Sequence, residues 1–244
     1  MEGRGGGGAL EDLGRRLARE IAEIYGCATD LRLVGLGAEA ALFRASWAGM
    51  DSMIKYRYPK PYRDPDLDLA LRARRTALEG KLLVEARISG VAVPAVLFVD
   101  AQGSLLVTDY LPGPKLRDVL EAMDPGIRAE VFRTLGSFVG RLHHRGIVHG
   151  DLTTSNVIMV EGRPFVIDFG LGSFSNELEE FGVDVHLMLR ALESTHPSVA
   201  GELYEEFMRG YEAVRGAAQA RAVRGKVAEI RRRGRYVAER RKRS

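Results

Sequence analysis

Two short clusters of polar residues in the segment 147–172 (IVHGDLTTSNVIMVEGRPFVIDFGLG) have the types and spacing needed for phosphoryl transfer. Asn156 lies five positions after Asp151, and Asp168 lies twelve positions after Asn156. In sites that transfer the terminal phosphoryl group of ATP, an aspartate so placed accepts the proton of the attacking hydroxyl or water. The asparagine and the second aspartate hold Mg²⁺. The sequence therefore predicts Asp151 as the proton acceptor, and Asn156 and Asp168 as metal ligands beside bound ATP.

The residues between Asn156 and Asp168 predict a β-hairpin. Apolar segments at 157–160 and 165–167 flank the turn residues EGRP at 161–164. A hairpin brings its two ends together, so the amide of Asn156 and the carboxylate of Asp168 are expected to converge on one metal ion. Asp184 precedes an apolar helical segment, and its carboxylate is expected to hold backbone amides around His149.

An earlier segment is expected to approach the phosphates. Residues 31–47 read as a strand, a glycine turn and a second strand, with Gly35 and Gly37 in the turn. Glycine lets backbone amides come close to a phosphate because no Cβ stands in the way. A protein-kinase glycine loop has a third glycine where this chain has Ala40, so the pattern is degenerate.

Lys55 lies on the next predicted strand, eighteen positions after Gly37. A lysine there can reach the α- and β-phosphates of ATP. The helix predicted over 67–88 carries Glu79 and Glu85, and Glu79 is favoured as the partner that holds Lys55. Two further strands, at 93–100 and 104–111, lead into a hinge where backbone groups of Asp109 and Leu111 are expected to bind adenine.

The bulk properties describe one globular domain split into two lobes. The chain has 244 residues, of which 45% are hydrophobic, and no apolar run approaches membrane-spanning length. The single cysteine, Cys27, excludes a disulfide framework, suits a reducing cytoplasm and is expected to be a small buried residue. We predict an N-terminal tail and helix (1–30), a β-rich N-lobe (31–109), a helical C-lobe (110–225) and a basic tail (226–244).

The charge is unevenly distributed. The net charge is +3, but the tail has nine Lys or Arg against two Glu, so the rest of the chain carries −4. A basic tail favours a polyanionic partner, while a solubilising charged helix is the alternative. The insertion 56–75 is also basic, with interleaved tyrosines, and suits either nucleic acid or a solvated loop. The candidate tRNA contacts in the tail are Arg231, Arg232, Arg233, Arg235, Arg241 and Lys242.

These motifs together resemble the small atypical kinase/ATPase subunit of the KEOPS complex, the family that includes the human p53-related protein kinase. The resemblance covers nearly the whole chain from about residue 31. It is carried by GAEA (37–40), IKYRYPKPYRDPDLD with LRARRTALE, IVHGDLTTSN, IDFGL, GVD (182–184), STHP (194–197) and the basic C-terminus.

The resemblance implies a minimal bilobal protein-kinase-like fold of the α+β class, with a β-rich N-lobe and a reduced helical C-lobe. It implies ATP and Mg²⁺ as ligands, serine phosphorylation, and ATP hydrolysis within a complex. That complex supports threonylcarbamoyl transfer to a tRNA adenosine beside the anticodon. The implied partners are the threonylcarbamoyl transferase subunit, a small bridging subunit and tRNA, with no membrane.

Three departures from ordinary protein kinases bear on the acceptor. Gly150 replaces the arginine before the catalytic aspartate, so a phosphorylated activation loop would have no obvious partner. Thr153 replaces the lysine that contacts the transferred phosphate. No Ala-Pro-Glu motif appears, and only thirteen residues separate Gly170 from Asp184. ATP hydrolysis, or phosphorylation of a segment that a partner delivers, is therefore expected.

Two other functions compete with this interpretation. Small-molecule kinases of the aminoglycoside or choline type also use His-Gly-Asp, but they normally carry a large helical substrate insertion, and sixty residues follow Asp184 here. A non-catalytic tRNA-binding or scaffold module is disfavoured because all five phosphate-site residues are present.

Overall fold

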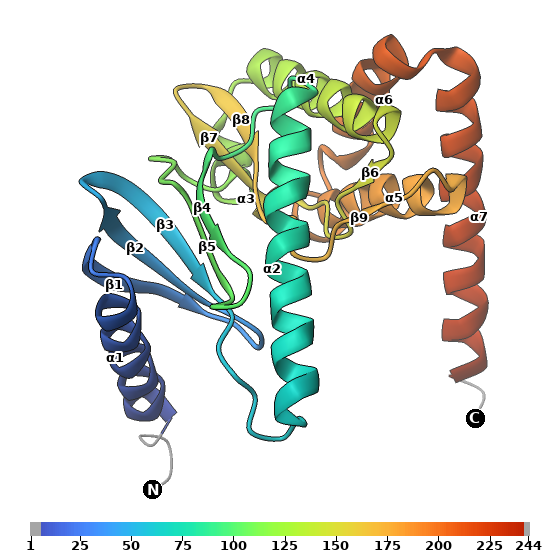
Figure 1. Ribbon diagram of the computed structural model, residues 1–244. Helices are drawn as coiled ribbons and strands as arrows, with labels where there is room; N and C mark the ends of the chain where they lie inside the picture. Colours follow the sequence, from blue (N-terminus) through green and yellow to red (C-terminus); the bar gives the residue numbers. More distant parts are fainter. Residues whose placement is uncertain (1–5, 242–244) are drawn as a thin grey trace, which may run out of the picture. The chain divides into compact units, whose positions relative to one another are not determined.

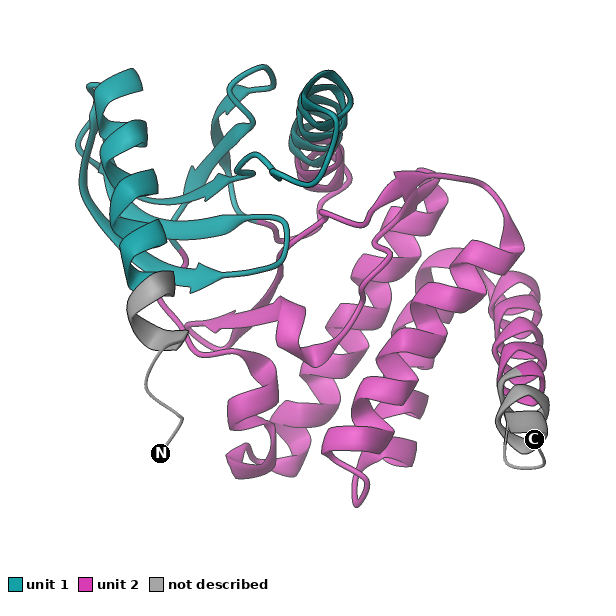
Figure 2. Cartoon of the chain, turned by 90° about the horizontal axis from the view of Figure 1, so that it is seen from below, with its two compact units in different colours: residues 1–81, 94–110 teal, residues 82–93, 111–244 magenta. Residues whose placement is uncertain are grey.

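The chain divides into two compact units in a computed structural model that describes residues 6–241 (Figure 1). Unit 1 comprises the residues up to Lys81 together with Pro94–Tyr110, and unit 2 comprises Leu82–Val93 and the residues from Leu111 onward (Figure 2). Unit 1 is rich in strands and unit 2 in helices, as the predicted α+β kinase-like fold requires. The segment Leu82–Val93, placed in the N-lobe from the sequence, groups with unit 2.

Unit 1 is built on a five-stranded antiparallel sheet covered by one amphipathic helix. Leu17 and Ile21, four residues apart on helix α1, are 2% and 1% exposed and join the same apolar core as Phe43 and Ile54 of the sheet. The elements are α1 (Gly6–Ile24) and, in sheet order, β1 (Ala28–Leu36), β2 (Ala41–Trp47), β3 (Met50–Tyr56), β5 (Leu105–Asp109) and β4 (Val96–Asp100).

Helix α2 (Pro65–Ile88) begins at a well-formed N-terminus and continues from unit 1 into unit 2. The Asp64 carboxylate accepts hydrogen bonds from the backbone amides of Asp66 and Leu67 at 3.1 Å each, which caps the first turn. Asp66 and Asp68 in that turn also complement the positive end of the helix dipole. The helix carries Glu79 on the part that belongs to unit 1.

Unit 2 packs helices and two small antiparallel strand pairs. Helices α4 and α6 lie side by side (Figure 1). A Cβ on Gly136 of α4 would lie 1.8 Å from the carbonyl oxygen of Phe207, and a Cβ on Gly210 of α6 would lie 1.8 Å from that of Arg133. Glycine at both positions lets the two backbones touch. The elements are α3 (Leu116–Val119), α4 (Pro125–His144), β6 (Ile147–Val148), β7 (Val157–Val160), β8 (Arg163–Val166), β9 (Ser173–Phe174), α5 (Leu178–Thr195), α6 (Ala200–Arg215) and α7 (Ala217–Arg241), with short 3-10 turns at Leu120–Ala122 and Thr154–Asn156.

Two expectations about individual segments need correction. Cys27 is exposed rather than buried, because it lies in the turn between α1 and β1, where side chains face solvent. The predicted basic tail is part of one helix that already begins at Ala217. No helix within residues 6–241 is long and apolar enough to cross a membrane.

A buried polar cluster links three helices of unit 2. The His143 ring is fully enclosed and stacks on Phe181 with ring centroids 4.3 Å apart. Its Nδ1 lies 3.0 Å from the Tyr211 hydroxyl and its Nε2 lies 3.3 Å from the Asp184 carboxylate. A neutral ring protonated on Nε2 satisfies both contacts, because it donates to the carboxylate and accepts from the hydroxyl. Burial lowers the pKa of His143 despite the neighbouring Asp184, and burial raises the pKa of Tyr211 to about 12.

The lowered pKa of His143 predicts acid sensitivity of unit 2. Below about pH 6.5 the unfolded chain takes up a proton on this imidazole more readily than the folded chain does, so the free energy of unfolding falls, by at most about 1.4 kcal/mol per pH unit. Urea unfolding between pH 7.5 and 5.5 measures this slope. His143→Gln, whose side-chain amide can still donate to Asp184, should flatten it. Burial also lowers the pKa of His186. Because the wild type and the variant both contain His186, its contribution to the slope is the same in both and cancels in the comparison. Equal slopes for the two proteins would contradict the prediction.

Candidate active site

Asp151 and Asn156 form a tightly connected pair on the loop between β6 and β7. The Asn156 side-chain nitrogen donates to both the backbone carbonyl oxygen and the carboxylate Oδ2 of Asp151, at 2.8 Å each. Because both partners are acceptors, the orientation of the amide is fixed, and its oxygen points elsewhere. The five-residue spacing therefore lets the side chain of Asn156 reach back to Asp151 within the same loop. One side chain orients the other and keeps its own oxygen available.

The loop that carries Asp151 is held by the carboxylate of Asp184 on α5. Asp184 is fully buried and accepts hydrogen bonds from the backbone amides of His149 at 2.7 Å and Gly150 at 2.8 Å, as the sequence predicted. Gly150 has φ +78°, and a Cβ there would lie 2.2 Å from the carbonyl oxygen of Leu171. The arginine of ordinary protein kinases would not fit this backbone, so its absence is a structural requirement of this loop.

His149 connects the loop to the segment that carries Asp168. The His149 Nδ1 accepts from the Asp151 backbone amide at 3.2 Å, and Nε2 donates to the Ile167 carbonyl oxygen at 3.0 Å. Since one nitrogen accepts and the other donates, the ring is the neutral Nε2–H tautomer. The ring is buried and packs against Phe169, with ring centroids 4.6 Å apart. The motif histidine thus positions the backbone on both sides of the site.

The predicted hairpin joins the two metal-ligand candidates. Strands β7 and β8 pair from Val157 with Val166 to Val160 with Arg163, and the Ile167 backbone amide donates to the Asn156 carbonyl oxygen at 2.9 Å. The turn is shorter than predicted, since it consists of Glu161 and Gly162 with φ +50° and +78°. Two residues with positive φ match the twist of the strands, and Arg163 and Pro164 belong to β8.

Asp168 has a local conformation suited to an exposed carboxylate. Its backbone is left-handed, with φ +63°, which is uncommon outside glycine and frequent at functional sites. Its Oδ1 accepts from the Gly170 backbone amide at 3.1 Å. The Asn156 amide oxygen and the Asp168 carboxylate are hard oxygen donors, the class that Mg²⁺ prefers. The donor set present in unit 2 therefore fits a magnesium ion.

Lys55 and Glu79 form the predicted ion pair within unit 1. The Lys55 ammonium donates to Glu79 Oε1 at 2.8 Å. The Glu79 side chain is 2% exposed and that of Lys55 is 16% exposed, so the lysine is the more accessible partner. The sequence did not identify a second cation on the same carboxylate, Arg57, which donates to Glu79 Oε2. Its position two residues after Lys55, just past the end of β3, was the available signal.

The glycine turn begins at Gly37, two residues later than the predicted start at Gly35. Gly35 belongs to β1, opposite Leu42, and so lies in the strand rather than in the turn. Gly37 is in the turn, where its amide donates to the Ala40 carbonyl oxygen at 2.8 Å and its own carbonyl accepts from the Tyr58 hydroxyl at 2.9 Å. A hairpin register that extends to Leu36 and Ala41 explains the difference.

The predicted adenine-binding segment follows β5. Asp109 ends the strand, where its side chain accepts from the Ala95 backbone amide at 2.7 Å. Its own amide donates to the Ala95 carbonyl oxygen at 3.0 Å, and the carbonyl of Leu111 accepts from Gly113. The role of Asp109 and Leu111 in binding adenine stays a prediction.

Most of the basic side chains in the insertion are neutralised inside unit 1. Arg72 donates to Asp68 at 2.7 Å, and Arg63 lies 3.4 Å from the same carboxylate. Arg75 pairs with Glu39. The cluster acts as an internal network that fixes the insertion, whereas Arg74 remains exposed.

The basic helix α7 is held by acidic residues of α5. Arg231 pairs with Glu193 at 2.8 Å, and Arg233 pairs with Glu179. Lys226 also lies 3.0 Å from Glu179. Among the candidate tRNA contacts, Arg231, Arg232 and Arg233 are all exposed. The side chains of Arg235 and Arg241, and all of Lys242, lie outside the part that the structure describes.

The segment after Gly170 is short and ordered by pairing. Ser173 and Phe174 form β9, which pairs with β6, and α5 begins at Leu178. This leaves no separate helical platform between the Asp-Phe-Gly motif and α5.

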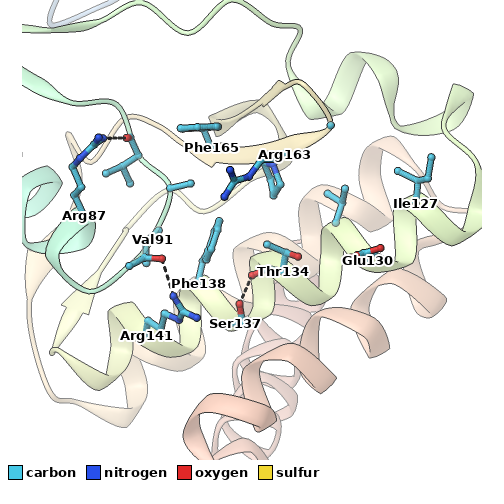
Figure 3. A pocket seen from close by; sticks show the side chains of 16 residues that line it. Arg87, Val91, Ile127, Glu130, Thr134, Ser137, Phe138, Arg141, Arg163 and Phe165 are labelled. Carbon is cyan, nitrogen blue, oxygen red and sulfur yellow. Dashed lines mark hydrogen bonds between the residues drawn. The ribbon is translucent and has the colours of Figure 1, made fainter.

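A groove of unit 2, of about 740 Å³, is formed by other residues than these. It is lined by α4, the loop after α2 and the β7–β8 hairpin, and Arg87, Arg141 and Arg163 border it near Phe138 and Phe165 (Figure 3). None of the predicted catalytic residues line it. The candidate site is therefore identified by its hydrogen-bonded side chains rather than by this groove.

Comparisons with known proteins identify the family of the chain. A family model described as a RIO domain matches residues 51–181. KEOPS complex subunit Bud32 of Pyrococcus abyssi is 42% identical, with 84% of this chain and 96% of the relative covered. The mouse EKC/KEOPS complex subunit Tp53rkb is 35% identical, with 89% and 91% covered. A probable bifunctional tRNA threonylcarbamoyladenosine biosynthesis protein of Methanothermobacter thermautotrophicus is 40% identical, but this chain spans only 36% of its length.

A solved structure of similar fold is the Rio2 kinase–ADP/Mg²⁺–phosphoaspartate complex from Chaetomium thermophilum. The TM-score is 0.60 at 15% sequence identity, with 93% of this chain and 77% of that chain covered, which shows a shared fold. The family match, the near full-length relatives and the kinase-like architecture lead to one conclusion. The chain belongs to the RIO-domain family of kinase-like proteins, among the Bud32 subunits of the KEOPS complex.

Proposed function

We propose that this chain is an ATP-dependent phosphotransferase, active as an atypical serine/threonine kinase and as an ATPase, that supports threonylcarbamoyladenosine formation in tRNA. The observation that carries the proposal is the Asp151–Asn156 pair. The Asn156 side-chain nitrogen donates two hydrogen bonds to Asp151, one to its backbone carbonyl oxygen and one to its carboxylate, and so fixes the orientation of that carboxylate. A site that only bound nucleotide would not need an oriented proton acceptor. The family relationship gives further support, and it does not favour a small-molecule phosphotransferase.

Asp151 is the proposed acceptor of the proton that leaves the attacking hydroxyl or water. Asn156 occupies Oδ2, which leaves Oδ1 to bind the nucleophile. The two backbone amides held by Asp184 and the bridging ring of His149 prevent the loop from rotating this carboxylate away. Most of the rate enhancement would come from positioning and charge neutralisation, as is general for phosphoryl transfer.

The phosphates of ATP require cations. We propose that Lys55, held by Glu79, binds the α- and β-phosphates. Asn156 and Asp168 would hold Mg²⁺, which supplies neutralisation of the phosphate charge when bound. Gly37, the nearby strand residue Gly35, and the backbone of Asp109 and Leu111 are proposed to contact the nucleotide.

The acceptor is proposed to be water or a segment that a partner presents. Gly150 and Thr153 replace the arginine and lysine of ordinary protein kinases, and α5 follows β9 closely. Without a docking platform, a freely diffusing peptide would be held poorly. The finer assignment to serine/threonine phosphorylation therefore depends on delivery by a partner.

The proposed partners are the threonylcarbamoyl transferase subunit, the small bridging subunit and tRNA, in the cytoplasm. The name of the methanogen relative supports the link to the transferase, because a region similar to this chain makes up 36% of a bifunctional protein of threonylcarbamoyladenosine biosynthesis. Two activities joined in one chain are expected to work together when they occur as separate subunits.

Replacing the proposed proton acceptor should separate binding from turnover. Asp151→Asn keeps the size of the side chain but removes its basicity, so ATP hydrolysis should fall at least about 100-fold. The dissociation constant for Mg–ATP should change by no more than about two-fold. Hydrolysis is measured with the transferase and bridging subunits and tRNA present, and nucleotide affinity by calorimetry. Asp118→Asn, which alters an exposed acid paired with Arg117, is the control. Unchanged hydrolysis in Asp151→Asn would remove the catalytic assignment.

The tail predicts a salt-dependent contact with tRNA. Since Lys226, Arg231 and Arg233 already pair with α5, removal of residues 234–244 tests the five basic residues that follow Arg233 without disturbing those pairs. The truncated chain should bind tRNA more weakly, and the slope of log affinity against log salt should flatten by about 0.7 per lost phosphate contact. Its ATP hydrolysis without tRNA should match that of the full chain. Unchanged affinity at moderate salt would show that the residues after Arg233 are not the contact.

A further inference from the structure

The groove of about 740 Å³ in unit 2 combines apolar side chains with arginines, and its volume is typical of a ligand-binding pocket. Its lining comes mainly from the end of α2 and the loop after it, from α4 and from β8. One arginine from each of these helices and from the strand borders it, namely Arg87, Arg141 and Arg163 (Figure 3). Because the lining contains none of the candidate active-site residues, the groove is open to a separate role.

The end of helix α2 shapes one wall of the groove. Gly90 has φ +79°, and its backbone amide donates to the Arg87 carbonyl oxygen at 3.0 Å. The amide of Val91 donates to the Ala86 carbonyl oxygen at 3.1 Å. These two bonds close the last helical turn around a left-handed glycine and direct Val91 inward, where it is 3% exposed. A Cβ on Gly90 would lie 2.7 Å from a guanidinium nitrogen of Arg141, so glycine also leaves the space that this arginine occupies.

Two of the arginines are held in place by backbone carbonyl groups. The Arg141 guanidinium donates to the Gly90 carbonyl oxygen at 2.8 Å. The Arg87 guanidinium donates to the Val93 carbonyl oxygen at 3.1 Å. Since a guanidinium has five N–H donors, one such bond orients the group and leaves other donors for a ligand.

The groove has an excess of positive charge. In the part of the chain that the structure describes, none of its three arginines has a carboxylate at ion-pair distance. Glu130 is the one acidic residue among the described residues that line the groove, so the lining has a net charge of +2. This charge favours an anionic ligand.

Apolar surface lies beside these charges. Ile127 on α4 is 52% exposed. Phe138 on α4 and Phe165 on β8 are half-buried and lie along the same groove (Figure 3). Exposed apolar surface with a polar rim is typical of an interaction site, and aromatic residues and arginine contribute strongly to binding at such sites. The expected occupant therefore has both an apolar side chain and several negative charges.

We propose that the groove binds an acidic segment of a partner protein, with an apolar side chain against Phe138 and Phe165 and carboxylates on the arginines. The arginines come from three separate elements, so carboxylates spaced along a peptide match them better than one compact anion does. RNA fits less well, because Glu130 would repel a phosphate chain and a net charge of +2 is small for a nucleic-acid site. This docking site is additional to the proposed function and does not depend on ATP binding.

The probe is a labelled peptide that has a central phenylalanine with glutamates on both sides, added to the full chain. An NMR titration of the wild type should give saturable shifts centred on Phe138, Phe165 and Arg163, with a dissociation constant of about 1 mM or tighter. Alanine in place of the peptide phenylalanine should weaken binding about five-fold, and lysines in place of the glutamates should abolish it. If about 2 mM peptide gives no saturable shift at these residues, or shifts centred elsewhere, the proposal is overturned.

Two variants at exposed positions test the charge and the apolar surface separately. Arg163→Glu should weaken peptide binding about five-fold, and Ile127→Ser about three-fold. The control is Arg221→Glu, the same charge reversal at an exposed residue of α7 outside the groove, which should leave the affinity unchanged. Equal affinities of the wild type and folded Arg163→Glu would contradict the proposal. Thermal unfolding shows which variants are folded, and the wild-type titration decides by itself if Arg163→Glu is not.

A labelled oligouridylate distinguishes a peptide site from a nucleic-acid site. If Arg163→Glu loses oligouridylate binding and keeps peptide binding, the groove is a nucleic-acid surface and the proposal is wrong. Neither titration includes ATP, so the absence of ATP hydrolysis would end the proposed function and leave this test intact. A failed peptide titration would in turn leave the proposed function as it stands.

Discussion

A buried carboxylate needs hydrogen-bond donors on both of its oxygens. Each unit of this protein contains one buried carboxylate that has them, and the surrounding residues are arranged around it. Burying an unpaired carboxylate is strongly unfavourable, so its surroundings are forced to supply hydrogen bonds. In unit 2 the carboxylate is Asp184, which accepts from two backbone amides and from His143. In unit 1 it is Glu79, which accepts from Lys55 and Arg57. Hydrogen bonding to Asp184 fixes the backbone of the loop that carries Asp151, and hydrogen bonding to Glu79 fixes the side chain of Lys55. These are residues proposed to take part in phosphoryl transfer.

The same constraint explains why the catalytic loop departs from that of ordinary protein kinases. To donate its amide to Asp184, Gly150 takes a left-handed backbone conformation against the carbonyl of Leu171. A larger residue would clash there, so the arginine that reads a phosphorylated loop is not compatible with this geometry. The loss of that switch and the stability of the loop are two consequences of one backbone conformation.

The parts of the site that depend on local spacing could be predicted from the sequence. The Asn156–Asp151 contact, the hairpin and the hold of Asp184 on the loop follow from short-range patterns. The burial of charged side chains was harder to predict, because the sequence of charges does not distinguish a buried arginine from a solvated one. Arg57 was counted among the surface cations of the insertion for that reason. Strand register and turn length were also beyond reach, so Gly35 was placed in the turn and Arg163 and Pro164 outside the strand.

In helix α7 the many basic residues make the sequence look like a solvated tail, although the helix also has a buried apolar face. Ala220, Val223 and Val227 are 1%, 0% and 3% exposed, and their spacing of three and four residues marks one buried helical face. Few apolar residues suffice because the flanking basic side chains pair with the acids of α5, so the helix is anchored by both kinds of contact. Some of the basic residues, such as Arg231 and Arg233, therefore pair with α5, although they are exposed to solvent as Arg232 is. The net charge of a tail indicates its attraction for a polyanion only when the basic residues that already pair with acidic residues of the same chain are left out of the count.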